Sequence, residues 1–137
     1  MEDFPNNPHN DELHRMLGEI YYTDSAYDKS IKHLQAYRSL RLEQQQEPLR
    51  NDIYLLGMAH YKIGQYAGAI DRLKEVKEWK DSISESAYLH LGHSYLRIGD
   101  EEKAKLSYAA AIQLNINSKV REEAMYNYVQ ATYLHNS

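Results

Sequence analysis

The sequence predicts an all-α protein, a solenoid in which antiparallel helix pairs stack along one axis. Three observations support this fold class. The 137 residues include only six Gly and three Pro, whereas helix formers such as Ala, Leu, Glu, Lys and Gln are frequent. A pattern centred on Leu-Gly recurs at intervals of 39 and 35 residues. No segment alternates apolar and polar residues as a half-buried strand would.

The repeated pattern divides the chain into helices and repeats of one domain, 1–137. Helices are expected near 10–23, 26–46, 49–62, 66–78, 82–97, 101–115 and 118–134. The repeats lie near 11–49, 50–84 and 85–121, with a half repeat at 122–137. Because each helix pair leaves a face for the next pair to cover, we expect this domain to be a fragment of a longer protein.

The first helix pair is predicted from the Leu-Gly step at Gly18. A glycine inside a helix costs roughly 1 kcal/mol relative to alanine, so Gly18 indicates that another helix approaches closely there. Ser30 would cross next to it, while Leu34 fills the wider gap beside the crossing. Ser25 stands where later repeats have a turn glycine, and we expect a similar turn with Asp24 or Ser25 capping the second helix.

The second and third pairs repeat these choices. Gly64 and Gly99 suit the positive φ at the end of a helix, and Asp100 is a good N-cap for the helix that follows. Pro48 is acceptable at the start of the third helix. In each pair we expect a glycine, a small residue that crosses beside it and a large residue that fills the gap. These are Gly57, Ala69 and Leu73 in the second pair, and Gly92, Ala104 and Tyr108 in the third.

The last helix is predicted from Ala124, which matches Ala87 at a distance of 37 residues. Tyrosines follow it, as they do in the earlier first helices. Only the first helix of this fourth repeat is present, so it would cap the stack or mark the point where a longer array was cut.

At these residues the chain resembles the tetratricopeptide repeat family, whose pattern is Leu-Gly, an aromatic residue, a Gly turn, a Tyr and then Ala. The resemblance covers nearly the whole chain and implies a right-handed α-solenoid that serves as a non-catalytic scaffold for protein interactions. The chain departs from the family in lacking the Pro that closes each repeat, at Leu42, Asp81 and Ile116. The opening Phe4-Pro5-Asn6-Asn7-Pro8 is similar to a junction between repeats in some bacterial cell-envelope members, which implies the bacterial type.

The resemblance also implies a groove lined by the first helices. Positions spaced i, i+3, i+7 and i+10 lie on one face of a helix. The chain has 13 Tyr but one Phe and one Trp, and this face gathers several of the tyrosines, a composition typical of interface cores. We expect it to bind an extended peptide or a partner helix, the alternative being that these side chains pack between repeats. The predicted partner-binding residues are Arg15, Glu19, Tyr22, Tyr54, Met58, Tyr61, Leu89, His93, Leu96, Tyr126 and Tyr133.

Some members of the family hold the C-terminal carboxylates of heat-shock chaperones with a Lys/Asn/Arg clamp on this face. Arg15 and Glu19 stand where the first clamp helix would need a basic residue and an Asn. Since Glu19 would repel a carboxylate, we expect no binding of that class.

Composition excludes several other functions. The net charge is −4, with both signs spread along the chain, so no basic stripe is present for nucleic acid. The absence of Cys excludes disulfides, thiolate zinc sites and cysteine nucleophiles. No apolar run approaches the ~20 residues that span a bilayer, so no membrane insertion is expected. The compartment stays open between the cytoplasm and, for an exported parent, the bacterial periplasm or cell envelope.

Enzymatic and metal sites find little support, and we predict no catalytic, cofactor-binding or metal-binding residues. His90 and His93, three residues apart on one predicted helix, suggest a zinc or nickel site together with His60 on the helix before. Such a His pair needs a further ligand, and the sequence contains no His-Glu-x-x-His motif. The carboxylates Glu101 and Glu102 are explained by their place at a helix start. A further alternative is self-association, forming a homo-oligomer through the exposed ends of the solenoid.

Overall fold

The computed structural model of the protein describes residues 10–134, so the motif from Phe4 to Pro8 lies outside the described residues. Within that range the chain forms seven α-helices and two short segments of other helical type. The α-helices are α1 (Asn10–Thr23), α2 (Tyr27–Glu43), α3 (Arg50–Lys62), α4 (Tyr66–Leu73), α5 (Ser82–Arg97), α6 (Glu101–Leu114) and α7 (Ser118–Val129). A 3₁₀ turn, η1 (Lys74–Val76), follows α4, and a π-helical segment, η2 (Gln130–Leu134), follows α7. The all-helical prediction is confirmed.

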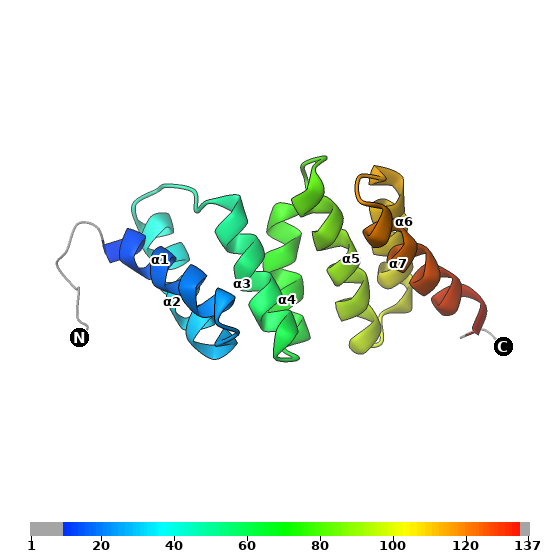
Figure 1. Cartoon of the computed structure of the whole chain (residues 1–137), viewed down its shortest axis with the longest axis horizontal. Helices are drawn as coiled ribbons and strands as arrows, with labels where there is room; N and C mark the ends of the chain where they lie inside the picture. The colour runs from blue at the N-terminus through cyan, green and yellow to red at the C-terminus, as the bar shows by residue number, and fades with distance from the viewer. Residues whose placement is uncertain (1–9, 135–137) are drawn as a thin grey trace.

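The helices stack as antiparallel pairs along the long axis of the molecule, with α1 and α7 at opposite ends (Figure 1). The pairs are α1 with α2, α3 with α4, and α5 with α6, while α7 packs on α5 and α6. The first helices of successive repeats, α1, α3, α5 and α7, also contact one another in turn. This arrangement creates one layer of first helices and a second layer of α2, α4 and α6.

Glycine lets the two helices of each pair approach closely, as the sequence predicted. A methyl group at Gly18 would lie 2.5 Å from carbons of Leu34, and one at Gly92 would lie 2.5 Å from the ring of Tyr108. The Ser30 hydroxyl donates a hydrogen bond to the Gly18 carbonyl at 2.8 Å. The small residue on the second helix therefore crosses beside the glycine, and the large one fills the adjacent space.

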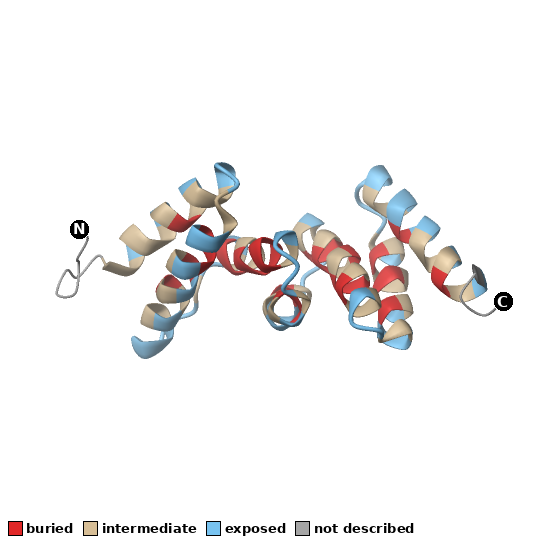
Figure 2. Cartoon of the chain, turned by 90° about the horizontal axis from the view of Figure 1, so that it is seen from below, coloured by how far each residue is buried: buried red, intermediate tan, exposed pale blue. Residues whose placement is uncertain are grey.

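The core lies where neighbouring helices meet. Figure 2 shows the buried residues gathered on these inner sides, with exposed residues on the turns and outer faces. The largest apolar side chains with almost no exposed surface are Leu34, Leu56, Leu73, Leu91, Val76 and Tyr108. They come from both layers, so each repeat depends on its neighbour to bury its core.

The turns inside the three full pairs share one geometry. Ser25, Gly64 and Gly99 have φ of 61°, 81° and 89°. In the first turn Ala26 N donates to Tyr21 O at 2.8 Å, and the residues after Gly64 and Gly99 make the same bond, at 2.9 and 2.8 Å. This bond satisfies a carbonyl at the end of the first helix. The similar turn expected at Ser25 is confirmed.

The caps of the second helices agree with the prediction only in part. Asp100 caps α6, accepting from Lys103 N at 3.2 Å. The N-cap of α2 is Ala26, which makes no side-chain hydrogen bond. Capping by Asp24 or Ser25 is therefore wrong, because Ser25 adopts the left-handed conformation that ends α1 instead.

Two helices end earlier than expected. The helix predicted to reach residue 46 ends at Glu43, because Gln45 has φ of 59° and Gln46 N turns back to Arg41 O at 2.9 Å. The helix predicted to reach residue 78 ends at Leu73 and tightens into η1. There the Val76 carbonyl accepts from Arg50 Nη2 at 2.6 Å, which holds this end of the helix against α3.

A buried acid on α5 fixes the start of α7. Glu85 is almost fully buried, and its carboxylate accepts from the backbone N–H of Ile116 at 2.7 Å and of Asn117 at 3.0 Å. Asn117 in turn caps α7 by accepting from Lys119 N and Val120 N. Glu85 therefore positions the half repeat on the third repeat.

Candidate interaction face

The first helices bring together the residues predicted to bind a partner, here called the first-helix face: the side of α1, α3, α5 and α7 on which those residues lie. A polar contact joins each helix to the next. Arg15 Nη1 lies 3.9 Å from Asp52 Oδ2, Tyr54 Oη lies 2.6 Å from Ser86 Oγ, and His93 Nε2 lies 2.8 Å from Glu123 Oε2. These contacts hold the four helices in register, so the face is preorganised.

Two of the predicted residues lie in the core. Met58 is 5% exposed and packs in the cluster that includes Ile53 and Leu73, while Leu89 is 3% exposed and packs with the third repeat and Ala124. The expectation that Met58 and Leu89 line an open groove is thus corrected. Successive first helices approach so closely that these positions fall between them rather than on the surface.

Three tyrosines and a leucine of the predicted set are half-buried. Tyr22, Tyr54, Tyr61 and Leu96 all pack against core clusters. The rings of Tyr22 and Tyr27 meet edge to face at 5.4 Å, and those of Tyr61 and Tyr66 at 5.8 Å. Burial, with smaller effects from Tyr54 and Tyr27, raises the pKa of Tyr22 to about 12. These tyrosines present only part of their surface to a partner.

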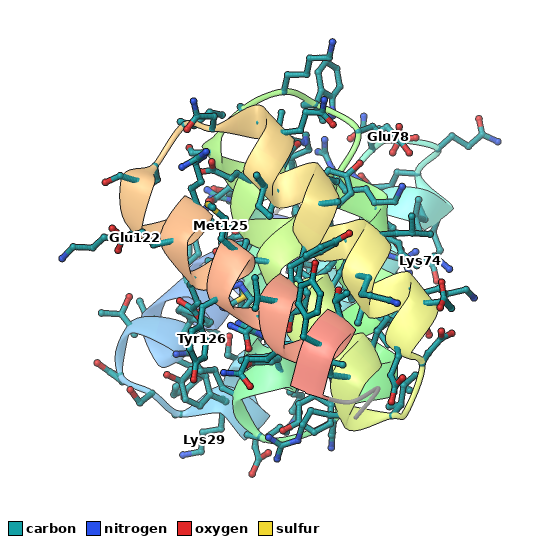
Figure 3. All side chains as sticks on the ribbon, turned by 90° about the vertical axis from the view of Figure 1, so that its right-hand side faces the viewer. Lys29, Lys74, Glu78, Glu122, Met125 and Tyr126 are labelled. Carbon is teal, nitrogen blue, oxygen red and sulfur yellow. The ribbon has the colours of Figure 1, made fainter. Side chains whose placement is uncertain are left out.

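The two tyrosines at the C-terminal end are exposed. Tyr126 is 65% exposed and Tyr133 is 68% exposed. Figure 3 shows Tyr126 on the side of α7 turned away from α6, opposite Lys74 and Glu78. Aromatic rings exposed beside a preorganised face are well suited to bind an apolar side chain of a partner.

His93 lies at the centre of a hydrogen-bonded chain across three helices. Its Nδ1 is 2.7 Å from the hydroxyl of buried Tyr108, and its Nε2 contacts Glu123. A neutral ring with its proton on Nε2 fits both contacts, since the tyrosine then donates to Nδ1 and the ring donates to the carboxylate. Burial of the Tyr108 hydroxyl raises its pKa well above the usual range. His93 thus joins α5 to α6 and α7.

The histidines that suggested a metal site are directed to other partners. His60 Nδ1 lies 2.8 Å from Gln65 Oε1, and His90 Nδ1 lies 2.8 Å from the Ser86 carbonyl. Desolvation by burial lowers the pKa of His90. No group of three or more His, Asp or Glu side chains between residues 10 and 134 is arranged to hold a metal ion.

The α1 end of the face contains an acid that sequence reasoning missed. Asp52 is 1% exposed, and Arg15 pairs with Glu12 and Glu19 next to it. Asp52 stands five residues before Gly57, where the third repeat has the buried Ala87 five residues before its own glycine. A charged residue in register with a buried alanine is the signal that could have revealed it.

The pKa of Asp52 is raised to about 8, first by burial, and then by its hydrogen bond and repulsion with Glu19, against the attraction of Arg15. Glu12 on α1 also raises this pKa. Burial, with a smaller effect of the Asp52 charge, raises the pKa of Tyr37 on α2. Native protein therefore binds a proton here that unfolded protein has released above about pH 4.

Stability should fall as the pH rises from about 4 to about 8, because deprotonating Asp52 in the native state costs more than in the unfolded chain. The Asp52→Asn variant, which mimics the protonated form, should lose this dependence and gain roughly 4 kcal/mol on wild type between pH 5 and pH 8.5, because each pH unit below the pKa of about 8 is worth about 1.4 kcal/mol. Urea unfolding at several pH values measures it. Parallel pH profiles for the two proteins would contradict the prediction.

None of the helices in residues 10–134 combines the length and the apolar character needed to cross a membrane.

Comparisons with known proteins agree with this architecture. Two family profiles, both described as tetratricopeptide repeat, match residues 53–82 and 85–115. Among solved structures, the crystal structure of MamA is similar with a TM-score of 0.68 and 22% sequence identity, covering 97% of this chain and 82% of that chain. A comparison with curated proteins gives no match. The two matches lie within the paired helices of residues 10–134, and they show that the chain contains tetratricopeptide repeats at residues 53–82 and 85–115.

Proposed function

We propose that the protein is a non-catalytic scaffold that binds a peptide or helix of a partner protein along the first-helix face. The observation that carries this proposal is the exposure of Tyr126 and Tyr133 beside helices held in register by polar contacts. The similarity of Phe4–Pro8 to a bacterial repeat junction supports the further proposal that the repeats are of the bacterial type.

Apart from the buried Met58 and Leu89, the predicted partner-binding residues lie where they could contact a partner. Tyr126 and Tyr133 offer open rings, while Tyr22, Tyr54 and Tyr61 form a half-buried aromatic floor with His93 stacked on Tyr61 at 6.2 Å. Aromatic residues are enriched among those that carry binding energy at protein interfaces. Arg15 and Glu19 add charge at the α1 end.

A random 12-residue peptide library displayed on phage provides the test. Peptides selected on wild type should bind the Tyr126→Ala, Tyr133→Ala variant at least about tenfold more weakly, because the loss of two exposed rings removes contacts without opening the core. The matched control is Leu106→Ala, an exposed apolar residue on α6, which should bind as wild type does. Failure to enrich any peptide, or equal binding by the tyrosine variant, would reject the face.

Self-association is the second candidate, favoured by apolar side chains exposed at both ends of the stack. Met16 and Ile20 are exposed on α1, and Met125 and Val129 on α7. If copies stack end to end, light scattering will give a mass that rises above 16.1 kDa with concentration and returns to it in Ile20→Glu. A constant monomer mass would exclude this candidate.

A further inference from the structure

A second groove lies on the side of α5 opposite the first-helix face. Its floor includes Leu91 and Tyr95, and its walls come from η1 and α6. Leu91 and Tyr95 each stand two residues after a position of the first-helix face, Leu89 and His93. Two residues correspond to about 200° around an α-helix, so the two sets point in nearly opposite directions. The groove is therefore separate from the surface proposed above.

Two adjoining pockets form this groove, called here the second-helix groove. One pocket has a volume of about 320 Å³ and the other of about 310 Å³. Lys77 and Tyr88 line both of them, so the pockets are continuous. Figure 3 places Lys74, from the wall formed by α4 and η1, on the side of the molecule away from Tyr126. The groove is long enough for several side chains of an extended ligand.

The lining of the second-helix groove is basic, although the chain as a whole has a net charge of −4. Lys74, Lys77, Lys80 and Lys103 line the two pockets, against the single carboxylate of Glu78. The Glu78 side chain is 75% exposed, and its Oε2 lies 3.6 Å from Lys77 Nζ. Such an exposed pair contributes little and leaves the lysine open to another partner. The groove thus gathers positive charge from both walls.

Cations lie over three aromatic rings of the groove, which restricts the lysine side chains before a ligand arrives. The distances to the ring centroids are 5.7 Å from Lys77 Nζ to Tyr88, 5.9 Å from Lys103 Nζ to Tyr95 and 5.3 Å from Arg50 Cζ to Trp79. Lys103 Nζ is also 3.8 Å from Asp100 Oδ2. A side chain that is already held near its binding position loses less entropy when it binds.

The second-helix groove also exposes two large apolar side chains. Trp79 is 60% exposed in one pocket, and Leu106 is 69% exposed in the other. Exposed apolar groups with a polar rim are typical of interaction sites, and tryptophan is enriched among residues that carry binding energy. A small anion would leave both side chains uncovered. The lining therefore fits a ligand that combines carboxylates with an apolar side chain.

We propose that the second-helix groove binds an extended acidic segment of a partner protein. Its Asp and Glu side chains pair with the lysines of the two walls, and an aromatic or large apolar side chain between them packs against Tyr88, which both pockets share. This inference goes beyond the proposed function, because it assigns a second binding surface on the opposite side of α5. The match of charge between groove and ligand carries it.

A nucleic acid fits this groove less well than a peptide does. Single strands bind by stacking bases on open aromatic rings, whereas Tyr88, Tyr95 and Trp79 each have a cation over one ring face. The net charge of −4 also repels a phosphate backbone, which needs a continuous basic track. A short acidic peptide needs only the local charge of the groove.

The test uses the peptide acetyl-Glu-Asp-Glu-Phe-Glu-Asp-Glu-amide and its neutral match, acetyl-Gln-Asn-Gln-Phe-Gln-Asn-Gln-amide. Since the chain has one tryptophan, Trp79, its fluorescence reports binding at the groove itself. The acidic peptide should shift the Trp79 emission and bind at least about tenfold more tightly than the neutral one. Raising the salt concentration from about 0.05 M to about 0.5 M should weaken the acidic peptide and hardly affect the neutral one.

A double lysine variant tests the two walls. Lys74→Gln, Lys103→Gln removes one charge from each wall and should weaken the acidic peptide about tenfold. Both residues are exposed, so the fold should be kept. The matched control is Lys32→Gln, Lys119→Gln, which removes two exposed lysines outside the groove and should bind as wild type does.

Three other results would overturn the proposal. Equal binding of the two peptides, or equal binding by the lysine variant and its control, would show that the groove does not select acidic ligands. Oligothymidylate that binds more tightly than the acidic peptide would make the groove a nucleic-acid site. A mass that rises with concentration in wild type but not in the lysine variant would make a second copy of the chain the occupant.

The two proposed surfaces can fail separately. The Tyr126→Ala, Tyr133→Ala variant should bind the acidic peptide as wild type does, whereas Leu106→Ala should weaken it about threefold. If the acidic peptide is weakened by the tyrosine changes and not by the lysine changes, it binds the first-helix face and the second-helix groove is rejected. If library peptides are weakened by the lysine changes and not by the tyrosine changes, the groove stands and the first-helix face is rejected.

Discussion

Replacing Gly92 with alanine is expected to destabilise the protein by about 2–3 kcal/mol, because the added methyl group overpacks a filled site. The new carbon would lie 2.5 to 2.8 Å from three ring atoms of Tyr108. That ring is fully buried and is held by its hydroxyl on His93, so it cannot move aside as a flexible chain end could. Thermal unfolding should show a melting temperature lowered by about 6–10 °C.

Gly99→Ala is the matched control for this change. A methyl group at Gly99 meets nothing within 4 Å, so its only cost is the strain of a side chain at φ of 89°, about 1 kcal/mol. If the two variants lose equal stability, close approach of α5 and α6 is not what position 92 requires.

Replacing Glu85 with alanine is the second change with a large expected effect, a loss of about 2–4 kcal/mol. The backbone N–H groups of Ile116 and Asn117 would be left without their acceptor, and the space of the side chain would be empty. Urea unfolding measures the loss. Hydrogen exchange locates it, since the amides of Ile116 and Asn117 should exchange much faster than those of α3.

Glu85→Gln separates the hydrogen bonds from the volume. A glutamine keeps the size and one acceptor oxygen, so it should lose only about 1 kcal/mol. Glu102→Ala, on the exposed side of α6, should change stability little. Unchanged exchange at residues 116 and 117 in Glu85→Ala would show that the contact does not hold the start of α7.

Local features of the fold could be predicted from the sequence because they depend on neighbouring residues. Gly64 and Gly99 mark turns by their conformational range, and the repeat spacing showed that Ser25 takes the same place. Asp100 could be predicted as the N-cap of α6 because it directly precedes a first turn that contains the acidic residues Glu101 and Glu102. Such features are decided within about one helical turn, which is the distance over which sequence patterns are informative.

The candidate site could be predicted only in part, because helical register gives the direction of a side chain but not the distance to the next helix. Tyr126 and Tyr133 are exposed as the register suggests, whereas Met58 and Leu89 share that register and are buried. Glu85 meets the turn before α7 across 31 residues, a pairing that no local pattern reveals. Such contacts depend on how two repeats pack together.

The pairing of helices only with near neighbours has a kinetic consequence. Within residues 10–134 each α-helix contacts the next one or the next but one along the chain. A chain folds quickly when its contacts join residues near one another in the sequence, because only short loops must form. A solenoid can also begin to fold at any stable helix pair and extend from that pair. The protein should therefore tolerate the addition of a repeat at either end, because the middle pair never contacts what is added.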